Sequence, residues 1–190
     1  MKTGTKVLIS LAAIFALILI WGISTNNSLV QLHEDVKYQQ GQVQSTLQRR
    51  SDLIPNLVAT VKGYAAHEET VFTDIADARS KLAGAISEGN LNEIESANDG
   101  LSSALGRLLA IQENYPDLKA NENFIALMDE IAGSENRINI AREKYNDKVA
   151  IYNKRIKVFP SNIIANMNGF VDEKYFEADE GSENAPKVEF

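Results

Sequence analysis

Cysteine is absent from the sequence, and its absence excludes several kinds of chemistry. The chain can form no disulfide framework and has no thiolate nucleophile. It also lacks the cysteine on which a lipobox lipid anchor is built.

Histidine is rare, and the recognisable catalytic motifs are missing. His33 and His67 are the two histidines, they share no helical spacing, and no HExxH pattern occurs, so a zinc site is not expected. The serines form no GxSxG elbow, and the glycines form no GxGxxG or P-loop run. The sequence therefore predicts no catalytic residue, no cofactor-binding residue and no metal ligand.

Basic residues are outnumbered by acidic ones. With Lys2 and Lys6 set aside, 17 basic residues remain against 26 acidic ones, which gives the rest of the chain a net charge of −9. Nucleic acid is not an expected partner, because its binding depends on basic surfaces that neutralise phosphates. Anionic headgroups should likewise repel this body, so an anchor and not its net charge must hold it at a membrane.

Charge is missing from one long stretch near the N-terminus. Between Lys6 and Glu34 the only ionisable side chain is His33, and residues 7–23 are apolar apart from Ser10 and a glycine. About 17–25 apolar residues cross the roughly 30 Å hydrocarbon layer of a bilayer. Trp21 lies near the end of the stretch, where an indole favours the headgroup region. We therefore expect a transmembrane helix over residues 7–25, preceded by a short tail over residues 1–6.

A cleaved signal peptide is the alternative interpretation of this stretch. Gly22 and Ser24 are small residues at plausible −3 and −1 positions of a cleavage site. The apolar run is longer than the usual h-region of about 7–15 residues, which favours a retained span.

The orientation of the span follows from the charges on its two sides. Lys2 and Lys6 precede the span, whereas the next basic residue, Lys37, comes after two acidic ones. The positive-inside rule then places the N-terminus in the cytoplasm and the rest of the chain across the membrane.

Proline occurs only four times, and the segments between the prolines have helical periodicity. The first helix is expected to continue almost directly from the span through Leu29, Leu32, Val36, Val43 and Leu47.

A second helix is expected to begin, or the chain to bend, at residues 51–55, where capping oxygens precede Pro55. Its apolar positions are Ile54, Leu57, Val58, Val61, Ala65, Phe72, Ile75 and Leu82, and it should end at Gly89. A third helix from Leu91 should stop before Pro116.

The fourth helix has the clearest pattern. Apolar or aromatic residues recur every seven positions at Phe124, Ile131, Ile138, Tyr145 and Tyr152. A second seam of this heptad contains Met128, Val149 and Ile156. We expect both tyrosines to pack with their hydroxyl groups hydrogen-bonded.

The predicted fold class is all-α: an N-terminal transmembrane helix followed by an antiparallel four-helix-type bundle with long coiled-coil-like helices. The bundle is expected over residues 26–160. Residues 161–190 are expected to form a short helical turn and an extended piece that pack on the bundle or on a neighbour. Within them, residues 178–184 are expected to be mobile, and residues 186–190 alternate in a way that suits either a docked strand or a loose end.

Several blocks of sequence resemble the LemA family. The blocks are Arg49-Arg50-Ser51-Asp52-Leu53-Ile54-Pro55-Asn56-Leu57-Val58, Val61-Lys62-Gly63-Tyr64-Ala65, His67-Glu68, Glu113-Asn114-Tyr115-Pro116-Asp117-Leu118-Lys119-Ala120-Asn121, Glu135-Asn136-Arg137-Ile138, Arg142, Tyr145-Asn146, Tyr152-Asn153 and Phe159-Pro160. The resemblance covers essentially the whole chain. It implies a bacterial single-span membrane protein with an antiparallel helical-bundle domain, at the inner (plasma) membrane, and it implies no particular activity.

Two charged residues interrupt the second seam of the fourth helix. Glu135 and Arg142 occupy positions where the heptad calls for apolar residues. A buried charge needs a partner, and the nearest candidates are Arg49, Arg50 and Asp52. We interpret these five residues as an internal polar layer that fixes the helix register, with a ligand pocket or an exposed seam as alternatives.

Three functions are compatible with these features. The leading hypothesis is a non-enzymatic, membrane-anchored scaffold or assembly subunit that forms homo-oligomers at a bacterial membrane surface. The second is an adaptor or regulator of another membrane protein, such as a protease or transporter. The third is a hydrolase that uses surface carboxylates or His67. The bilayer, contacted through residues 7–25, is the expected partner in the first two.

Overall fold

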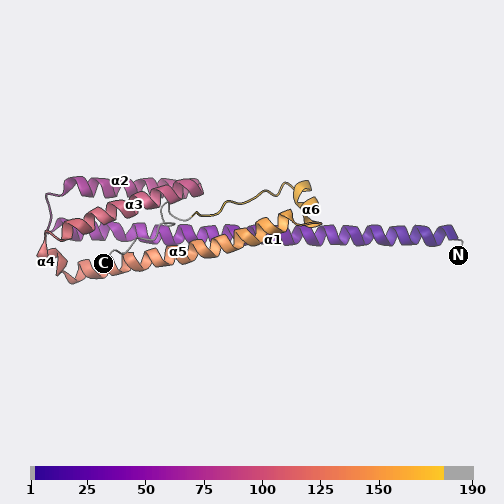
Figure 1. The fold of residues 1–190 in the computed structure, drawn as a ribbon, viewed down its shortest axis with the longest axis horizontal. Helices are drawn as coiled ribbons and strands as arrows, with labels where there is room; N and C mark the ends of the chain where they lie inside the picture. Colours follow the sequence, from indigo (N-terminus) through magenta and orange to yellow (C-terminus); the bar gives the residue numbers. More distant parts are fainter. Residues whose placement is uncertain (1–2, 178–190) are drawn as a thin grey trace, which may run out of the picture. The chain divides into compact units, whose positions relative to one another are not determined.

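The computed structural model describes residues 3–177, without the side chain of Thr5. Over this range the regular structure is helical and contains no strand, so the all-α prediction is confirmed. The expectations for residues 178–184 and 186–190 lie outside the described residues. The helices are α1 (Thr3–Lys62), α2 (Glu69–Glu88), α3 (Leu91–Gln112), α4 (Pro116–Lys119), α5 (Glu122–Lys157) and α6 (Ser161–Met167) (Figure 1).

The first helix continues without a break from the apolar stretch into the folded body, as the sequence predicts. It passes through Pro55 and ends at Lys62, so residues 51–55 do not start a new helix. Proline inside a helix removes one backbone hydrogen bond, the one to the carbonyl of residue i−4. Here that carbonyl belongs to Ser51, and it accepts a hydrogen bond from Nε of Arg79 in α2 at 3.2 Å. A side chain of another helix therefore replaces the bond that Pro55 cannot make.

The prediction of a single helix from Ile54 to Leu82 is wrong. The chain leaves helical structure after Lys62 and α2 begins at Glu69, with Ala65 buried in between. Because Ala65 is apolar and keeps the spacing of three to four residues, the periodicity gives no sign of the break. The end of α2 is as predicted: Gly89 has φ of 74° and donates its N–H to the carbonyl of Ala85.

The helix α3 begins at an N-cap formed by the side chain of Asn90. The helix α5 buries the residues of the predicted heptad. Oδ1 of Asn90 accepts from the backbone N–H of Asn92 at 3.2 Å at the start of α3. Pro116, expected to stop α3, occupies the first turn of the short helix α4. The heptad residues of α5 are buried: Phe124, Ile131, Ile138, Tyr145 and Tyr152.

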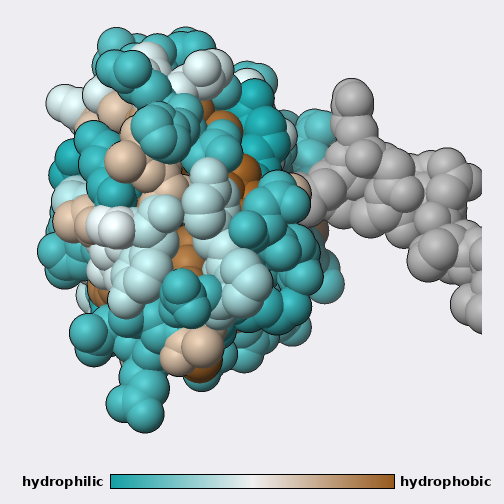
Figure 2. Space-filling model, turned by 90° about the vertical axis from the view of Figure 1, so that its left-hand side faces the viewer, coloured by the Kyte–Doolittle hydropathy of each residue, from teal (hydrophilic) through white to brown (hydrophobic). Residues whose placement is uncertain are grey.

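The structure divides into two compact units, which are described separately. Unit 1 contains Met1–Gln40 and Tyr145–Lys174, and unit 2 contains Gly41–Lys144 and Tyr175–Phe190. In unit 2, side chains of α1, α2, α3, α4 and α5 share one apolar core, around Leu57, Ile75, Leu105, Leu118 and Phe124. Figure 2 views the end of unit 2 where α4 lies, and the coloured surface there is mostly hydrophilic.

In unit 1, α1 packs with the last turns of α5, with α6 and with the non-helical residues 168–174. Burial on α1 begins at Thr25 and continues through Leu29 and Val36. Before Thr25 the large apolar side chains of α1 are exposed, from Val7 at 54% to Ile23 at 62%. The apolar stretch is thus a helix without a protein neighbour over most of its length.

Candidate functional site

The predicted polar layer lies in unit 2, and its centre is Arg50 of α1. The Arg50 side chain is only 4% exposed. One of its terminal nitrogens, Nη1, lies 2.6 Å from Oε2 of Glu135 on α5 and donates to Oδ1 of Asn98 on α3 at 3.0 Å. Three helices therefore meet at one guanidinium group.

The environment of Arg50 is partly unfavourable to its charge. Burial lowers the pKa of the Arg50 guanidinium, Glu135 raises it, the nearby Arg142 lowers it, and Asp99 raises it. Arg142 is itself 9% exposed, and its guanidinium lies 5.4 Å from the ring centroid of Phe176. The layer thus contains two buried cations, Arg50 and Arg142. The carboxylate of Glu135 offsets the charge of Arg50, and the ring of Phe176 offsets that of Arg142.

The other two predicted members lie away from this centre. Arg49 pairs with Glu130 on the surface, with an Nη2–Oε1 distance of 3.0 Å. Asp52 is exposed and accepts a hydrogen bond from Nε2 of Gln48 at 2.9 Å. The structure therefore brings together Arg50, Glu135 and Arg142 of the five predicted residues. That the layer fixes helix register stays a prediction.

Sequence reasoning missed two members of the layer. Asn98 is 1% exposed, and it follows Ile94 by four residues and precedes Leu101 by three. An amide at an apolar position of a helical pattern was the available signal. The hydrogen bond of Arg79 could not be predicted from the sequence pattern. Its acceptor is the backbone carbonyl of Ser51, which lacks its usual helical partner because Pro55 has no N–H.

A second polar cluster lies in unit 1 and holds residues 171–174 against α5. Asn153 donates its Nδ2 to the carbonyl of Glu173 at 2.8 Å and accepts from the N–H of Glu173 at 2.9 Å. The hydroxyls of Tyr152 and Tyr145 donate to the carbonyls of Val171 and Lys174 at 3.0 and 2.9 Å. Side chains of α5 thus satisfy the backbone hydrogen-bonding groups of this non-helical segment. The predicted hydrogen bonds of both tyrosine hydroxyls are confirmed.

His33 joins this second cluster from α1. Its Nε2 lies 3.0 Å from Oε1 of Glu173, and its ring stacks on Tyr152 with centroids 5.3 Å apart. Burial, and then the charge of Glu173, raise the pKa of Tyr145 to about 12. His33 lies four residues after Leu29 and three before Val36, so its place in the apolar pattern of α1 was a signal that its side chain faces the folded body.

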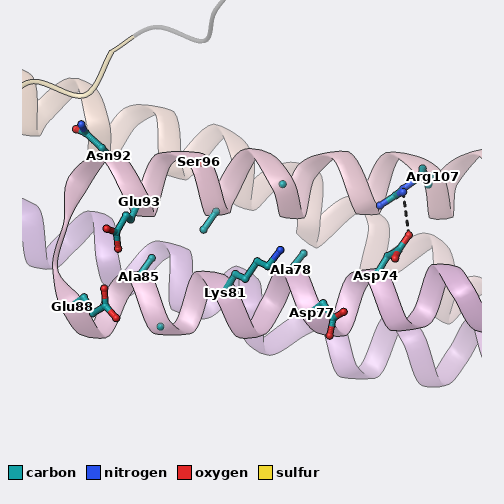
Figure 3. A pocket seen from close by; sticks show the side chains of 13 residues that line it. Asp74, Asp77, Ala78, Lys81, Ala85, Glu88, Asn92, Glu93, Ser96 and Arg107 are labelled. Carbon is teal, nitrogen blue, oxygen red and sulfur yellow. Dashed lines mark ion pairs between the residues drawn. The ribbon is translucent and has the colours of Figure 1, made fainter.

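An open groove of about 690 Å³ runs between α2 and α3 in unit 2 (Figure 3). Small residues, including Gly84, Ala85 and Ala97, line it. Charged side chains flank these small residues: Asp74, Asp77, Lys81, Glu88, Glu93 and Arg107. Arg107 pairs with Asp74 at 3.0 Å, which leaves the remaining charges of the groove mainly negative.

The residues considered for hydrolysis are not gathered into a site. His67 is exposed in the connection between α1 and α2, and Glu68 accepts a hydrogen bond from the hydroxyl of Tyr115 at 3.2 Å. Among residues 3–177, no group of three or more histidine, aspartate or glutamate side chains is arranged to hold a metal ion.

By length and composition, α1 is a candidate membrane span. It is the one helix of the described chain that is long and apolar enough to cross a bilayer, and its most apolar window has no protein contact that buries it.

Comparison with known proteins gives a consistent set of relatives. Magnetosome protein MamQ 2 of Paramagnetospirillum magneticum is 29% identical, over 80% of this chain and 64% of its own length. Magnetosome protein MamQ of Magnetospirillum gryphiswaldense is 28% identical, over 79% of this chain and 64% of its own length. Protein LemA of Metamycoplasma hominis is 24% identical, over 83% of this chain and 71% of its own length. The chain thus spans less than two thirds of the MamQ relatives.

A family comparison covers the first polar cluster and the part of the second that α5 and residues 171–174 supply, whereas His33 lies outside it. The LemA family model matches residues 39–190, which include Arg50, Glu135 and Asn153. The match covers most of the chain. The protein therefore belongs to the LemA family.

Proposed function

We propose that the protein is a non-enzymatic, membrane-anchored scaffold that forms homo-oligomers at the surface of a bacterial membrane. The observation that carries the proposal is the continuity of α1, which runs as one helix from exposed apolar side chains into the cores of the folded body. Such a helix cannot be hydrated without a large cost, because each buried apolar side chain gains roughly 1.5–3 kcal/mol. A bilayer supplies the missing apolar surroundings.

The anchor is proposed to be a retained single span with its N-terminus in the cytoplasm. The positive-inside rule supports this orientation through Lys6, because the opposite end of the span is followed by Glu34 and Asp35. The absence of cysteine makes the test simple. A single cysteine at Thr3 should be protected from a membrane-impermeant maleimide in intact cells, and one at Asn123 should react. The reverse pattern contradicts the orientation, and an intact mass that lacks residues 1–24 contradicts the retained span.

Self-association is supported by a surface on α1 that carries no charge. No charged residue occurs between Lys37 and Arg49, although the body as a whole is strongly acidic. Gln42, Ser45 and Gln48 are exposed there. Repulsion between two acidic copies is weakest where neither presents charge. Confinement to a membrane also raises the effective concentration of the copies, so weak contacts suffice for assembly.

Added charge on this surface tests the assembly. The double variant Gln42→Glu with Ser45→Glu should lose the oligomer on a blue-native gel while its melting temperature stays the same. The matched control, Asn123→Glu with Ala126→Glu, adds two charges at the same spacing on exposed positions of α5 and should keep it. Oligomers that survive in the first variant would contradict the proposed surface.

The groove between α2 and α3 favours a second function, that of an adaptor for another membrane protein. Its small residues and negative rim suit a basic peptide segment of a partner. An adaptor predicts a stoichiometric heterocomplex after crosslinking in cells, and Asp77→Lys with Glu93→Lys should abolish it. A crosslinked product that contains only copies of this chain supports the scaffold instead.

A further inference from the structure

An exposed apolar surface lies at the end of α5 and on α6, in unit 1. We call it the interfacial patch and define it by five exposed side chains: Val158, Phe159, Ile163, Met167 and Val171. Phe159 and Met167 are each 76% exposed and Val171 is 70% exposed. Contiguous apolar side chains at such exposure mark a contact surface.

Within unit 1, α6 approaches the apolar helix closely. A Cβ atom added at Gly22 of α1 would lie 3.7 Å from Cδ1 of Ile164, which lies beside Ile163 in α6. Gly22 belongs to the last turn of the apolar stretch, and Trp21 beside it is 38% exposed. Figure 1 shows α6 lying against α1 there. A span that ends at this level puts the headgroup region of the bilayer beside α6.

The charges around the patch are opposite in sign to those of the body. Lys154, Arg155 and Lys157 form the last turn of α5 directly before the patch, and all three are exposed. Lys157 pairs with Asp172 at 2.9 Å. With Glu173 counted as well as Asp172, the three basic residues still outnumber the two acidic ones beside the patch, on a protein whose net charge is −7. Basic side chains beside apolar ones match the interface of an anionic leaflet, where apolar groups enter the acyl boundary and cations meet the headgroups.

From these observations we infer that α6 and the turn before it form an interfacial foot, which inserts the interfacial patch into the anionic headgroup layer next to the point where α1 leaves the bilayer. The inference rests on the proposed function, because it needs α1 to span the membrane. The foot fixes the tilt and height of unit 1 above the membrane, which a single helical span alone leaves free to rotate and tilt.

Single cysteines in the otherwise cysteine-free full-length protein test the foot. Met167→Cys, Phe15→Cys and Ala83→Cys are labelled separately with an environment-sensitive fluorophore. The proteins are reconstituted in vesicles of equal parts phosphatidylcholine and phosphatidylglycerol. The label at 167 should show blue-shifted emission and be quenched by lipids that carry a nitroxide near the headgroup. The label at 15 should be quenched by nitroxides deep in the acyl chains. The label at 83, on exposed α2, should be quenched only by a water-soluble agent.

The outcomes separate the foot from the anchor. A label at 167 that is open to the water-soluble quencher, while the label at 15 is deep in the bilayer, overturns the foot and leaves the span intact. A label at 167 that is shielded from water and from lipid quenchers means that a second copy covers the patch, which also overturns the foot. Failure of lipid quenching at 15 overturns the span and the proposed function together.

The electrostatic part of the inference has its own variant. Lys154→Gln with Arg155→Gln should reduce the lipid quenching of the label at 167. Lys81→Gln with Lys144→Gln removes two exposed lysines elsewhere and should leave that quenching unchanged. Equal quenching in both double variants would show that headgroup charge does not hold the patch, and would overturn the choice of an anionic leaflet.

Discussion

At the residue scale, a few buried polar groups lie where helices meet. Arg50 is the clearest of these, because it is almost fully buried and bonds to two other helices. An apolar residue of similar volume could have filled the same space at comparable stability. We expect a charge at this position to favour the helix register that brings Glu135 and Asn98 to it.

Removal of the charge on Glu135 should therefore be costly. Glu135→Gln keeps the shape but leaves the Arg50 cation without its counter-charge. Loss of one partner of a buried pair costs about 3–5 kcal/mol, and the 40% exposure of the Glu135 side chain reduces this to about 2 kcal/mol. Urea unfolding of the full-length protein in mild detergent measures the change. Glu130→Gln, on the same helix and in surface pairs with Arg49 and Arg137, should cost about 1 kcal/mol or less. Equal costs would contradict the internal layer.

The bond between Arg79 and Ser51 should depend on Pro55. Arg79→Met leaves the buried carbonyl of Ser51 unpaired, at a cost of about 1–3 kcal/mol. In a Pro55→Ala background the helix can supply its own N–H to this carbonyl, so the same change should cost less. A double-mutant cycle by urea unfolding measures the difference. Additive costs would show that Arg79 does not replace the missing backbone bond.

Alkaline pH should weaken the hold of Tyr145 on the extended segment. The pKa of Tyr145 is about 12 in the folded protein and 10.0 ordinarily, so folding favours the protonated hydroxyl. This stabilisation is complete below pH 10 and is lost as pH rises from 10 through 12, to an extent of about 2 kcal/mol. Unfolding free energies at pH 9 and pH 11 measure the loss. Tyr145→Phe should flatten this dependence, whereas Tyr38→Phe, at an exposed position, should not. An unchanged slope in Tyr145→Phe speaks against the account.

At the element scale, the sequence pattern located most helices but not every reversal of the chain. The heptad of α5 was readable because its residues point into the cores over the whole helix. The break after Lys62 was not, because Ala65 continues the apolar spacing while the backbone already turns. A local pattern reports which side of the chain is buried, and it does not report against which partner.

The two glycines at and before the end of α2 should respond in opposite ways to the same substitution. Gly89 has φ of 74°, which an alanine adopts only with strain, so Gly89→Ala should destabilise by about 1 kcal/mol. Gly84 lies inside α2 with open space at its Cβ position, so Gly84→Ala should stabilise by about 0.5–1 kcal/mol. Thermal unfolding of both variants measures the signs. Stabilisation by Gly89→Ala would contradict the left-handed end of α2.

At the scale of the whole molecule, composition predicted the fold class and the anchor better than the site. The run of apolar residues before Thr25 and the helical spacing after it are properties of the chain itself, and both reappear in the structure. The polar clusters depend on residues far apart in sequence. Arg50 with Glu135 could be foreseen because charges interrupted an apolar seam, whereas His33 with Glu173 could not, because nothing local links them.

The central claim is that this chain acts as an anchored scaffold, and the size distribution of the full-length protein tests it most directly. The protein would be extracted in mild detergent and examined by native mass spectrometry and cryo-electron microscopy over a range of concentrations. The account predicts a discrete homo-oligomer with α1 of each copy embedded in the detergent belt. A monomer at every concentration would contradict the scaffold. It would favour the adaptor hypothesis, in which a partner binds at the α2–α3 groove.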